Sequence, residues 1–279
     1  MNTWLRLNRK IQHIRSWTGS IKDVAEFPKA IALSQYRSRA PIGSSLYARC
    51  MRRLGHRQLC VHPRMLDGLS IALRPTNTSE LVIYEELFFE KVYDFSSIRF
   101  EPDVVLDCGG FQGYFTLLAN VHFPSAKFLA FEPSPLNYKA MLSNFERNSL
   151  PIDARQQAVS IHAGAMMFAG EGYGGHLATT VDENSVEVQV VDLREIVSDL
   201  ASRRLLLKLD VEGEENTILP ALLPILPSTC AIFFEWHHSD SALRQIESSL
   251  QNAGFTTERN RTREGPDGIV YVDALAIRN

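Results

Sequence analysis

Cysteine is scarce in this chain: there are four in 279 residues, and no two are spaced as Cys-x-x-Cys. Such scattered thiols exclude a zinc site built on paired cysteines and argue against a disulfide framework. No apolar run reaches the roughly 18 residues that a transmembrane helix needs. The first residues carry charges but no continuous apolar segment, so we expect no secretory signal. Together these absences favour a protein of the reducing cytoplasm.

Charge is distributed unevenly along the chain, although the formal net charge is only −3. Residues 1–66 carry 13 Lys and Arg against two acids, whereas the remaining residues carry 16 bases and 30 acids. We therefore expect a basic, mainly helical N-terminal extension over residues 1–66 and an acidic domain over residues 67–279. The acidic domain would repel phosphates, which argues against a nucleic-acid partner.

The role of the extension stays open at this point. Apolar residues recur at roughly helical spacing from Trp4 to Val24 with basic residues between them, which predicts an amphipathic helix. Such a helix could contact a membrane surface or an anionic carrier, pack on its own acidic domain, or join two subunits of a homodimer.

From about residue 103 onward, strand and helix patterns alternate. The expected strands span residues 103–107, 127–132, 154–159, 204–210 and 230–235, with two more near 254–258 and 269–277. The expected helices span residues 113–122, 135–148, 191–200, 214–222 and 240–252. This order predicts an α/β fold with a doubly wound, mostly parallel sheet of about seven strands.

A glycine turn follows the first of these strands. Asp107 ends the strand, and Gly109, Gly110 and Gly113 then open a helix. About twenty residues later Glu132 ends the second strand, as in α/β nucleotide-binding units. The glycines permit a sharp turn and close approach of a ligand, and an acid in the position of Glu132 can accept both hydroxyls of a ribose.

Polar residues mark the ends of the later strands as well. The fourth strand runs into Asp210-Val211-Glu212-Gly213-Glu214-Glu215, and the fifth ends in Glu235-Trp236-His237-His238. Lone buried charges are expensive, so packing does not explain acids at four of five strand ends. Helix capping would account for Glu214 and Glu215 but not for Asp210. A solvent-exposed strand end is the alternative for the two histidines.

A glycine-rich stretch interrupts the alternation between the third and fourth strands. Four glycines lie within Gly170–Gly175, after Met166-Met167-Phe168-Ala169. It is either a lid or acceptor-binding loop, or a surface hairpin that joins two accessory strands.

These segments together resemble the FkbM-type family of S-adenosylmethionine-dependent methyltransferases. The resemblance covers roughly residues 70–240 and is carried by Val104 to Gly113, by Phe131-Glu132-Pro133, and by Leu207-Lys208-Leu209-Asp210-Val211-Glu212-Gly213. The chain departs from the family at Phe111, where an Asn is usual. The resemblance implies a class I methyltransferase fold, and the basic extension lies outside it.

Roles transfer residue by residue. The resemblance implies that Asp107, Gly109, Gly110, Gly113, Glu132 and Asn137 bind S-adenosylmethionine, and that Asp210, Glu212 and His237 are catalytic, with Glu235 bordering the acceptor pocket. Asp107 also favours this cofactor on chemical grounds, because a carboxylate would crowd a pyrophosphate but suits an ammonium. A metal is conceivable beside so many acids, but the sequence does not require one.

The expected activity is O-methyl transfer to a hydroxyl of a sugar, glycan or secondary metabolite. Asp210 and His237 are the candidates for the general base that takes the hydroxyl proton. Two alternatives remain. A nicotinamide-dependent oxidoreductase would use the same turn, although the chain lacks a clean G-x-G-x-x-G and a Tyr-x-x-x-Lys set. A catalytically silent binding protein on the same fold is the other.

Overall fold

The computed structural model describes residues 59–63, 66–74, 78–169, 175–178, 185–264 and 269–279. The chain forms two compact units, Met1–Glu90 with Glu146–Ser149, and Lys91–Phe145 with Leu150–Asn279. The helix expected between Trp4 and Val24 lies outside the described residues, so the extension over residues 1–66 stays a prediction. Within the described ranges, no helix is both long and apolar enough to cross a bilayer.

The described part of the first unit is a short hairpin followed by a helix. Strand β1 (Leu59–Val61) pairs antiparallel with β2 (Ile71–Leu73). Helix α5 (Thr78–Glu85) continues as a wider helical turn, η2 (Glu86–Glu90). The buried Glu80 carboxylate accepts hydrogen bonds from the backbone and side chain of Arg74, so it ties the helix to the strand before it.

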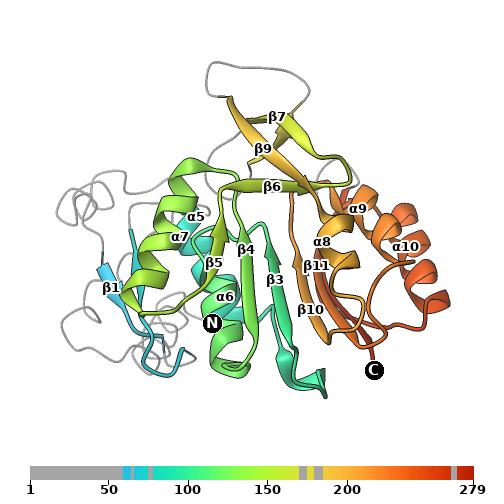
Figure 1. The fold of residues 1–279 in the computed structure, drawn as a ribbon, viewed down its shortest axis with the longest axis horizontal. Coiled ribbons are helices and arrows are strands. Elements are labelled where there is room, and N and C mark those ends of the chain that lie inside the picture. Colours follow the sequence, from blue (N-terminus) through green and yellow to red (C-terminus); the bar gives the residue numbers. More distant parts are fainter. Residues whose placement is uncertain (1–58, 64–65, 75–77, 170–174, 179–184, 265–268) are drawn as a thin grey trace, which may run out of the picture. The chain divides into compact units, whose positions relative to one another are not determined.

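The second unit is built on a seven-stranded sheet, which confirms the predicted fold class (Figure 1). Its strands are β3 (Val104–Cys108), β4 (Lys127–Phe131), β5 (Asp153–Arg155), β10 (Leu205–Leu209), β11 (Cys230–Ser239), β12 (Thr256–Glu264) and β13 (Ile269–Arg278). They lie in the order β12-β13-β11-β10-β3-β4-β5. The five strands from β5 to β11 are parallel, and β13 and β12 close the sheet as an antiparallel hairpin.

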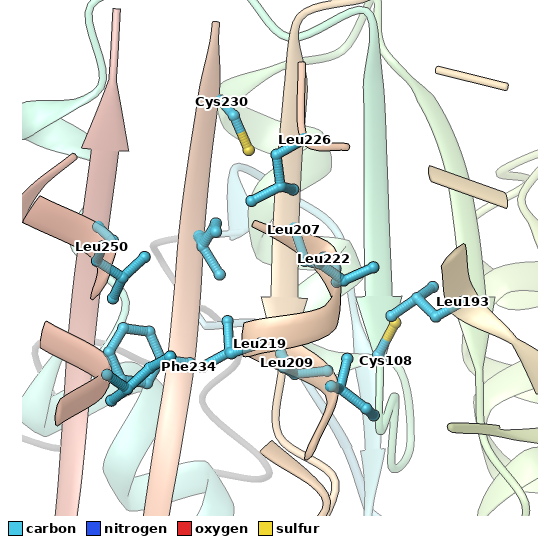
Figure 2. Close-up of a cluster of buried hydrophobic side chains, with 14 of the residues drawn as sticks. Cys108, Leu193, Leu207, Leu209, Leu219, Leu222, Leu226, Cys230, Phe234 and Leu250 are labelled. Carbon is cyan, nitrogen blue, oxygen red and sulfur yellow. The ribbon is translucent and has the colours of Figure 1, made fainter. Parts of the chain in front are cut away.

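Five helices of this unit follow the strands close to where the pattern predicts them: α6 (Tyr114–His122), α7 (Pro135–Arg147), α8 (Leu193–Ser198), α9 (Glu215–Leu222) and α10 (Asp240–Asn252). Leucines of β10, α8, α9 and α10 meet in one buried cluster with Cys108, Cys230 and Phe234 (Figure 2). β10 is buried at all five positions, as a central parallel strand must be. Both cysteines in the cluster are free thiols.

The strand order reverses between β3 and β10. The chain runs outward from β3 to β4 and β5, and then returns to lay β10 along the other side of β3. Ligands of open α/β sheets bind beyond the carboxyl ends of the strands at such a point. The register places Lys208 opposite Asp107 and Leu209 opposite Cys108. The turn after β3 and the acidic turn after β10 are therefore neighbours.

The third predicted strand, 154–159, is in fact two strands in two different sheets. β5 ends at Arg155, and β6 (Gln157–Ser160) belongs to a four-stranded sheet ordered β6-β9-β7-β8. Its other members are β7 (Gly164–Ala169), β8 (His176–Ala178) and β9 (Val186–Asp192) (Figure 1). Residues 166–169 and 176 are thus in accessory strands, whereas residues 170–174 of the glycine-rich stretch lie outside the described residues.

Candidate active site

At two positions of the turn after β3, neighbouring atoms of the chain lie so close that only glycine fits. Gly109 has φ 82°, and a Cβ there would stand 1.8 Å from the carbonyl oxygen of Asp210. Gly113 caps α6 with φ 82°, and its Cβ would lie 2.5 Å from the ring of Phe145. At Gly110 the same position is 2.9 Å from the sulfur of Met141. Protein atoms fill the space that the glycines leave, so their contact with a cofactor stays a prediction.

Glu132 joins the end of β4 to this glycine turn. Its Oε2 accepts the backbone N–H of Phe111 at 2.7 Å, and its Oε1 accepts that of Ser134 at 2.9 Å. Phe111, which departs from the family pattern, adopts φ 48° to make this contact. Burial raises the pKa of Glu132 to about 7, against hydrogen bonds from Ser134, Phe111 and Asn137 that lower it. Each carboxylate oxygen keeps acceptor capacity for another hydroxyl.

Asp107 is buried below the turn, with a side chain only 1% exposed. Thr116 donates its hydroxyl to Oδ2 at 2.6 Å, whereas Oδ1 has no hydrogen-bond partner. A buried carboxylate oxygen without a donor is costly. The ammonium of a methionine tail, directly or through water, is a donor of the right charge, so this residue fits S-adenosylmethionine.

Lys208 is a residue of the site to which the sequence analysis assigned no role. Its side chain is 5% exposed, and its Nζ donates to the carbonyl of Gly109 at 2.7 Å. The same ammonium lies 3.1 Å from Asp210 and 3.6 Å from Asp107. Burial lowers its pKa, but the two carboxylates outweigh that effect and hold the pKa above its usual range. One lysine thus bridges the acids of β3 and β10.

The predicted catalytic residues do meet, around the imidazole of His237. Nε2 lies 3.7 Å from Glu212 and 3.6 Å from Glu235, and Nδ1 lies 3.5 Å from Glu215. Asp210, Glu212 and His237 offer donor atoms within 4.8 Å of one another. β11 makes this possible because it extends to Ser239, four residues past the predicted end, while the last residue of β10, Leu209, pairs with Phe234. The residues of β11 beyond Phe234, which we call the overhang of β11, therefore reach the acidic turn after β10.

Crowding of carboxylates changes the proton affinities of the cluster. Burial raises the pKa of Asp210 to about 6, although Lys208 lowers it. Burial and the neighbouring Asp210 raise the pKa of Glu212 to about 8. Burial lowers the pKa of His237, but Glu215 and Glu235 outweigh it and raise that pKa well above the usual range. The imidazolium form is therefore favoured, and an imidazolium cannot accept a proton.

Glu214 and Glu215 lie at the start of α9, as the capping interpretation placed them, but Glu215 also has a second role. The side chain is fully buried and accepts the backbone N–H groups of Val211 at 2.8 Å and Gly213 at 2.9 Å. It thereby closes the turn in which Glu212 has φ 52°. The exposed strand end considered for His238 is wrong, because its Nε2 contacts the Gly213 carbonyl at 2.8 Å in a part-buried position. The sequence signals for this turn were its density of acids and the family resemblance of Leu207 to Gly213.

The closing hairpin adds residues that carried no sequence signal. Arg263 of β12 donates to Glu235 at 3.1 Å, and the ring of Tyr271 on β13 meets that of His237 edge-on at 5.5 Å between centroids. The antiparallel register sets Tyr271 opposite His237. These long-range pairings follow from the sheet and not from any local motif.

Comparison with known proteins agrees with this geometry. A family profile described as the Methyltransferase FkbM domain matches residues 107–257. The 31-O-demethyl-FK506 methyltransferase FkbM of Streptomyces tacrolimicus is 28% identical over 229 residues, covering 69% of this chain and 88% of the relative. Methyltransferase sdnD of Sordaria araneosa is 27% identical over 233 residues, with the same two coverages of 69% and 88%.

Among solved structures, methyltransferase FkbM from Methylobacillus flagellatus KT aligns with a TM-score of 0.44 at 15% identity, covering 91% of this chain and 60% of that one. The family profile covers more than half of the chain and includes every residue singled out above from Asp107 to His238. The protein therefore belongs to the FkbM methyltransferase family, with S-adenosylmethionine as its cofactor.

Proposed function

We propose that this methyltransferase transfers the methyl group to oxygen, on a hydroxyl of a sugar, glycan or secondary metabolite. One observation carries the proposal: the acid best placed to receive a hydroxyl proton, Asp210, lies against the glycine turn, with its carbonyl oxygen over Gly109. The name of the Streptomyces tacrolimicus relative, a 31-O-demethyl-FK506 methyltransferase, supports transfer to oxygen.

The cofactor residues are assigned as follows. Glu132, steadied by Asn137, would hold the ribose hydroxyls, and Asp107 would face the ammonium through Oδ1, which accepts no hydrogen bond. Gly109, Gly110 and Gly113 would shape the turn beside them. When bound, S-adenosylmethionine supplies a sulfonium methyl that passes to the acceptor oxygen as its bond to sulfur breaks, leaving S-adenosylhomocysteine.

The protein's own residues act on the acceptor. Asp210 would take the hydroxyl proton, because a carboxylate with a pKa of about 6 is ionised at neutral pH yet more basic than an ordinary Asp. His237 is the weaker candidate, since its carboxylate neighbours favour the protonated ring. Glu212 and Glu235 would line the acceptor side. Alignment of the reacting groups supplies the larger share of the rate.

The localisation of the protein and its other partners are proposals as well. We place the protein in the cytoplasm, with no nucleic-acid partner. Contact of residues 1–66 with a membrane or an anionic carrier, and formation of a homodimer, are separate proposals that truncation of this region would test.

The experiment compares wild type with Asp210→Asn on a panel of hydroxylated sugars and polyketide alcohols. Mass spectrometry reports the gain of a methyl group, and alkaline treatment separates ethers from esters. We expect an alkali-stable product from wild type, and a loss of about a hundredfold or more in the variant with unchanged binding of S-adenosylhomocysteine. Full turnover by Asp210→Asn would refute the role of this residue, and a methylated amine or carboxylate would refute O-methyl ether formation.

A further inference from the structure

We propose that Asp210, Glu212 and His237 form a binding site for one divalent first-row transition-metal ion, at the acceptor side of the active site. This inference rests on the proposed function and specifies what activates the acceptor. The three side chains come from two neighbouring segments, the turn after β10 and the overhang of β11. Their donor atoms lie within 4.8 Å of one another, close enough for all three to reach one ion.

The spacing around the imidazole is the first observation. The separations of 3.6 and 3.7 Å from Nε2 to Glu235 and Glu212 exceed the 2.7–3.2 Å of a good N–H···O hydrogen bond. Two ligands that each lie about 2.1 Å from an ion, at an angle of about 110–120°, are roughly 3.4–3.6 Å apart. The 3.7 Å between Nε2 of His237 and the carboxylate of Glu212 is therefore close to the spacing of two ligands that share an ion.

The state of His237 is the second observation. Its side chain is 11% exposed, and Nδ1 is buried without a hydrogen-bond partner. Nδ1 faces the carboxylate of Glu215 at 3.5 Å, and two backbone N–H groups fix that carboxylate in place. A ligating histidine commonly directs its second nitrogen to a carboxylate in this way, which leaves Nε2 for the metal.

Charge provides the third argument. Five carboxylates lie in this part of the site: Asp210 and Glu212 themselves, and Asp107, Glu215 and Glu235. Among the described residues, the cations that form ion pairs with them are Lys208, Arg263 and the protonated form of His237. The carboxylates outnumber these cations in a site where charges are poorly solvated. A divalent cation bound among them would reduce that imbalance.

The donor set narrows the class of ion. Two carboxylates and one imidazole suit Mn²⁺, Fe²⁺, Co²⁺ or Zn²⁺, whereas Ca²⁺ prefers six to eight oxygen ligands. Side-chain exposures of 20% for Asp210 and 27% for Glu212 keep both carboxylates in contact with solvent. A hydroxyl bound to such an ion loses its proton more readily than a free one.

The test is a titration of the chelator-treated full chain with Mn²⁺, followed through the electron paramagnetic resonance of the free ion, and a calorimetric titration with Zn²⁺. Wild type should bind one equivalent of at least one of these ions. Glu212→Gln and His237→Asn should each weaken binding at least about tenfold, and Glu215→Gln should weaken it by about 10–100-fold through the orientation of the ring.

Matched controls are Glu195→Gln and His162→Asn, whose side chains are exposed on other elements and should bind as wild type does. Circular dichroism checks folding, and if His237→Asn does not fold, the partly exposed Glu212 still provides the test. Absence of binding at millimolar ion would overturn the proposal, as would equal affinity of wild type, Glu212→Gln and His237→Asn. In that second case the ion is adventitious.

Failure of this proposal and failure of the proposed function give different results. If the chelated protein binds S-adenosylhomocysteine and methylates a hydroxyl at full rate, the metal site is refuted and O-methyl transfer stands. If the metal binds as expected but no hydroxyl is methylated, the proposed function fails and the metal site stands.

Discussion

The ammonium of Lys208 lies 3.1 Å from the carboxylate of Asp210, where the strand order of the sheet reverses. Because the same ammonium donates to the carbonyl of Gly109, it links the glycine turn after β3 to the acidic turn after β10.

Replacement of Lys208 by Met should destabilise the fold by about 3–5 kcal/mol, because the change leaves Asp107 and Asp210 as buried charges without their cation. Urea denaturation measures the loss. The matched control is Lys139→Met on the exposed face of α7, which should stay within about 0.5 kcal/mol of wild type. Equal stability of the two variants would show that Lys208 does not compensate the acids.

Replacement of Gly109 by Ala should destabilise the protein far more than Gly213→Ala. Both glycines have positive φ, 82° and 110°, so both pay the conformational cost of about 1–2 kcal/mol. A Cβ at Gly109 collides with the Asp210 carbonyl, whereas at Gly213 no atom lies within 4 Å. The difference in unfolding free energy therefore reports the approach of the two turns, and a difference near zero would contradict it.

Affinity for S-adenosylhomocysteine should fall as the pH drops below about 7. Burial raises the pKa of Glu132 to about 7, so acid converts the carboxylate that we propose accepts the ribose hydroxyls into a neutral acid. The loss should not exceed about tenfold per pH unit. Calorimetric titrations of wild type and Glu132→Gln between pH 6 and 8, roughly one unit either side of that pKa, make the comparison, and the variant should bind weakly with little dependence on pH.

The same group makes an opposite contribution to the stability of the ligand-free protein. Its folded-state pKa lies above the ordinary value of 4.5, so its favourable contribution is fully present below that value and is lost as the pH rises through about 7. Denaturation of wild type and Glu132→Gln across this range should show a larger loss in wild type, because Asp210 and Glu212, whose pKa values are also raised, titrate in both proteins.

The core beside β10 should respond to truncation as a closely packed interior does. Leu222 of α9 is fully buried in the cluster of Figure 2, so Leu222→Ala should cost about 2–5 kcal/mol. Leu136 on α7 is 73% exposed, and Leu136→Ala should change the unfolding free energy by less than about 0.5 kcal/mol. Thermal or urea denaturation of the pair checks the assignment of the core.

Hydrophobic periodicity was enough to predict the central architecture. The apolar runs of β3, β4 and β10 end in acids, and a glycine turn follows the first of them. The sheet and the point at which its strand order reverses therefore follow from the sequence. The prediction of a single third strand was wrong, because residues 153–160 form one continuous strand-like pattern along the chain. The change of sheet between Arg155 and Gln157 depends on pairing of β6 with β9, about thirty residues further on.

The acidic residues of the site could be predicted from the sequence, whereas the basic residues Lys208 and Arg263 could not. Asp210, Glu212 and His237 stand out because polar residues at the ends of apolar strands need a reason. A single Lys208 within an apolar strand gives no indication of whether it faces water or two carboxylates. Arg263 and Tyr271 reach the site only through the antiparallel register of β12 and β13 with β11, which no local pattern encodes.

The most direct test of the whole account is a calorimetric titration of S-adenosylhomocysteine into wild type and Glu132→Ala at a pH above 7, where Glu132 is ionised. The account predicts saturable binding at one site per chain in wild type and binding weakened by at least about tenfold in the variant, which loses the hydrogen bonds to the ribose. No heat of binding in wild type, or equal affinity in the two proteins, would contradict the assignment of this end of the sheet as the cofactor site.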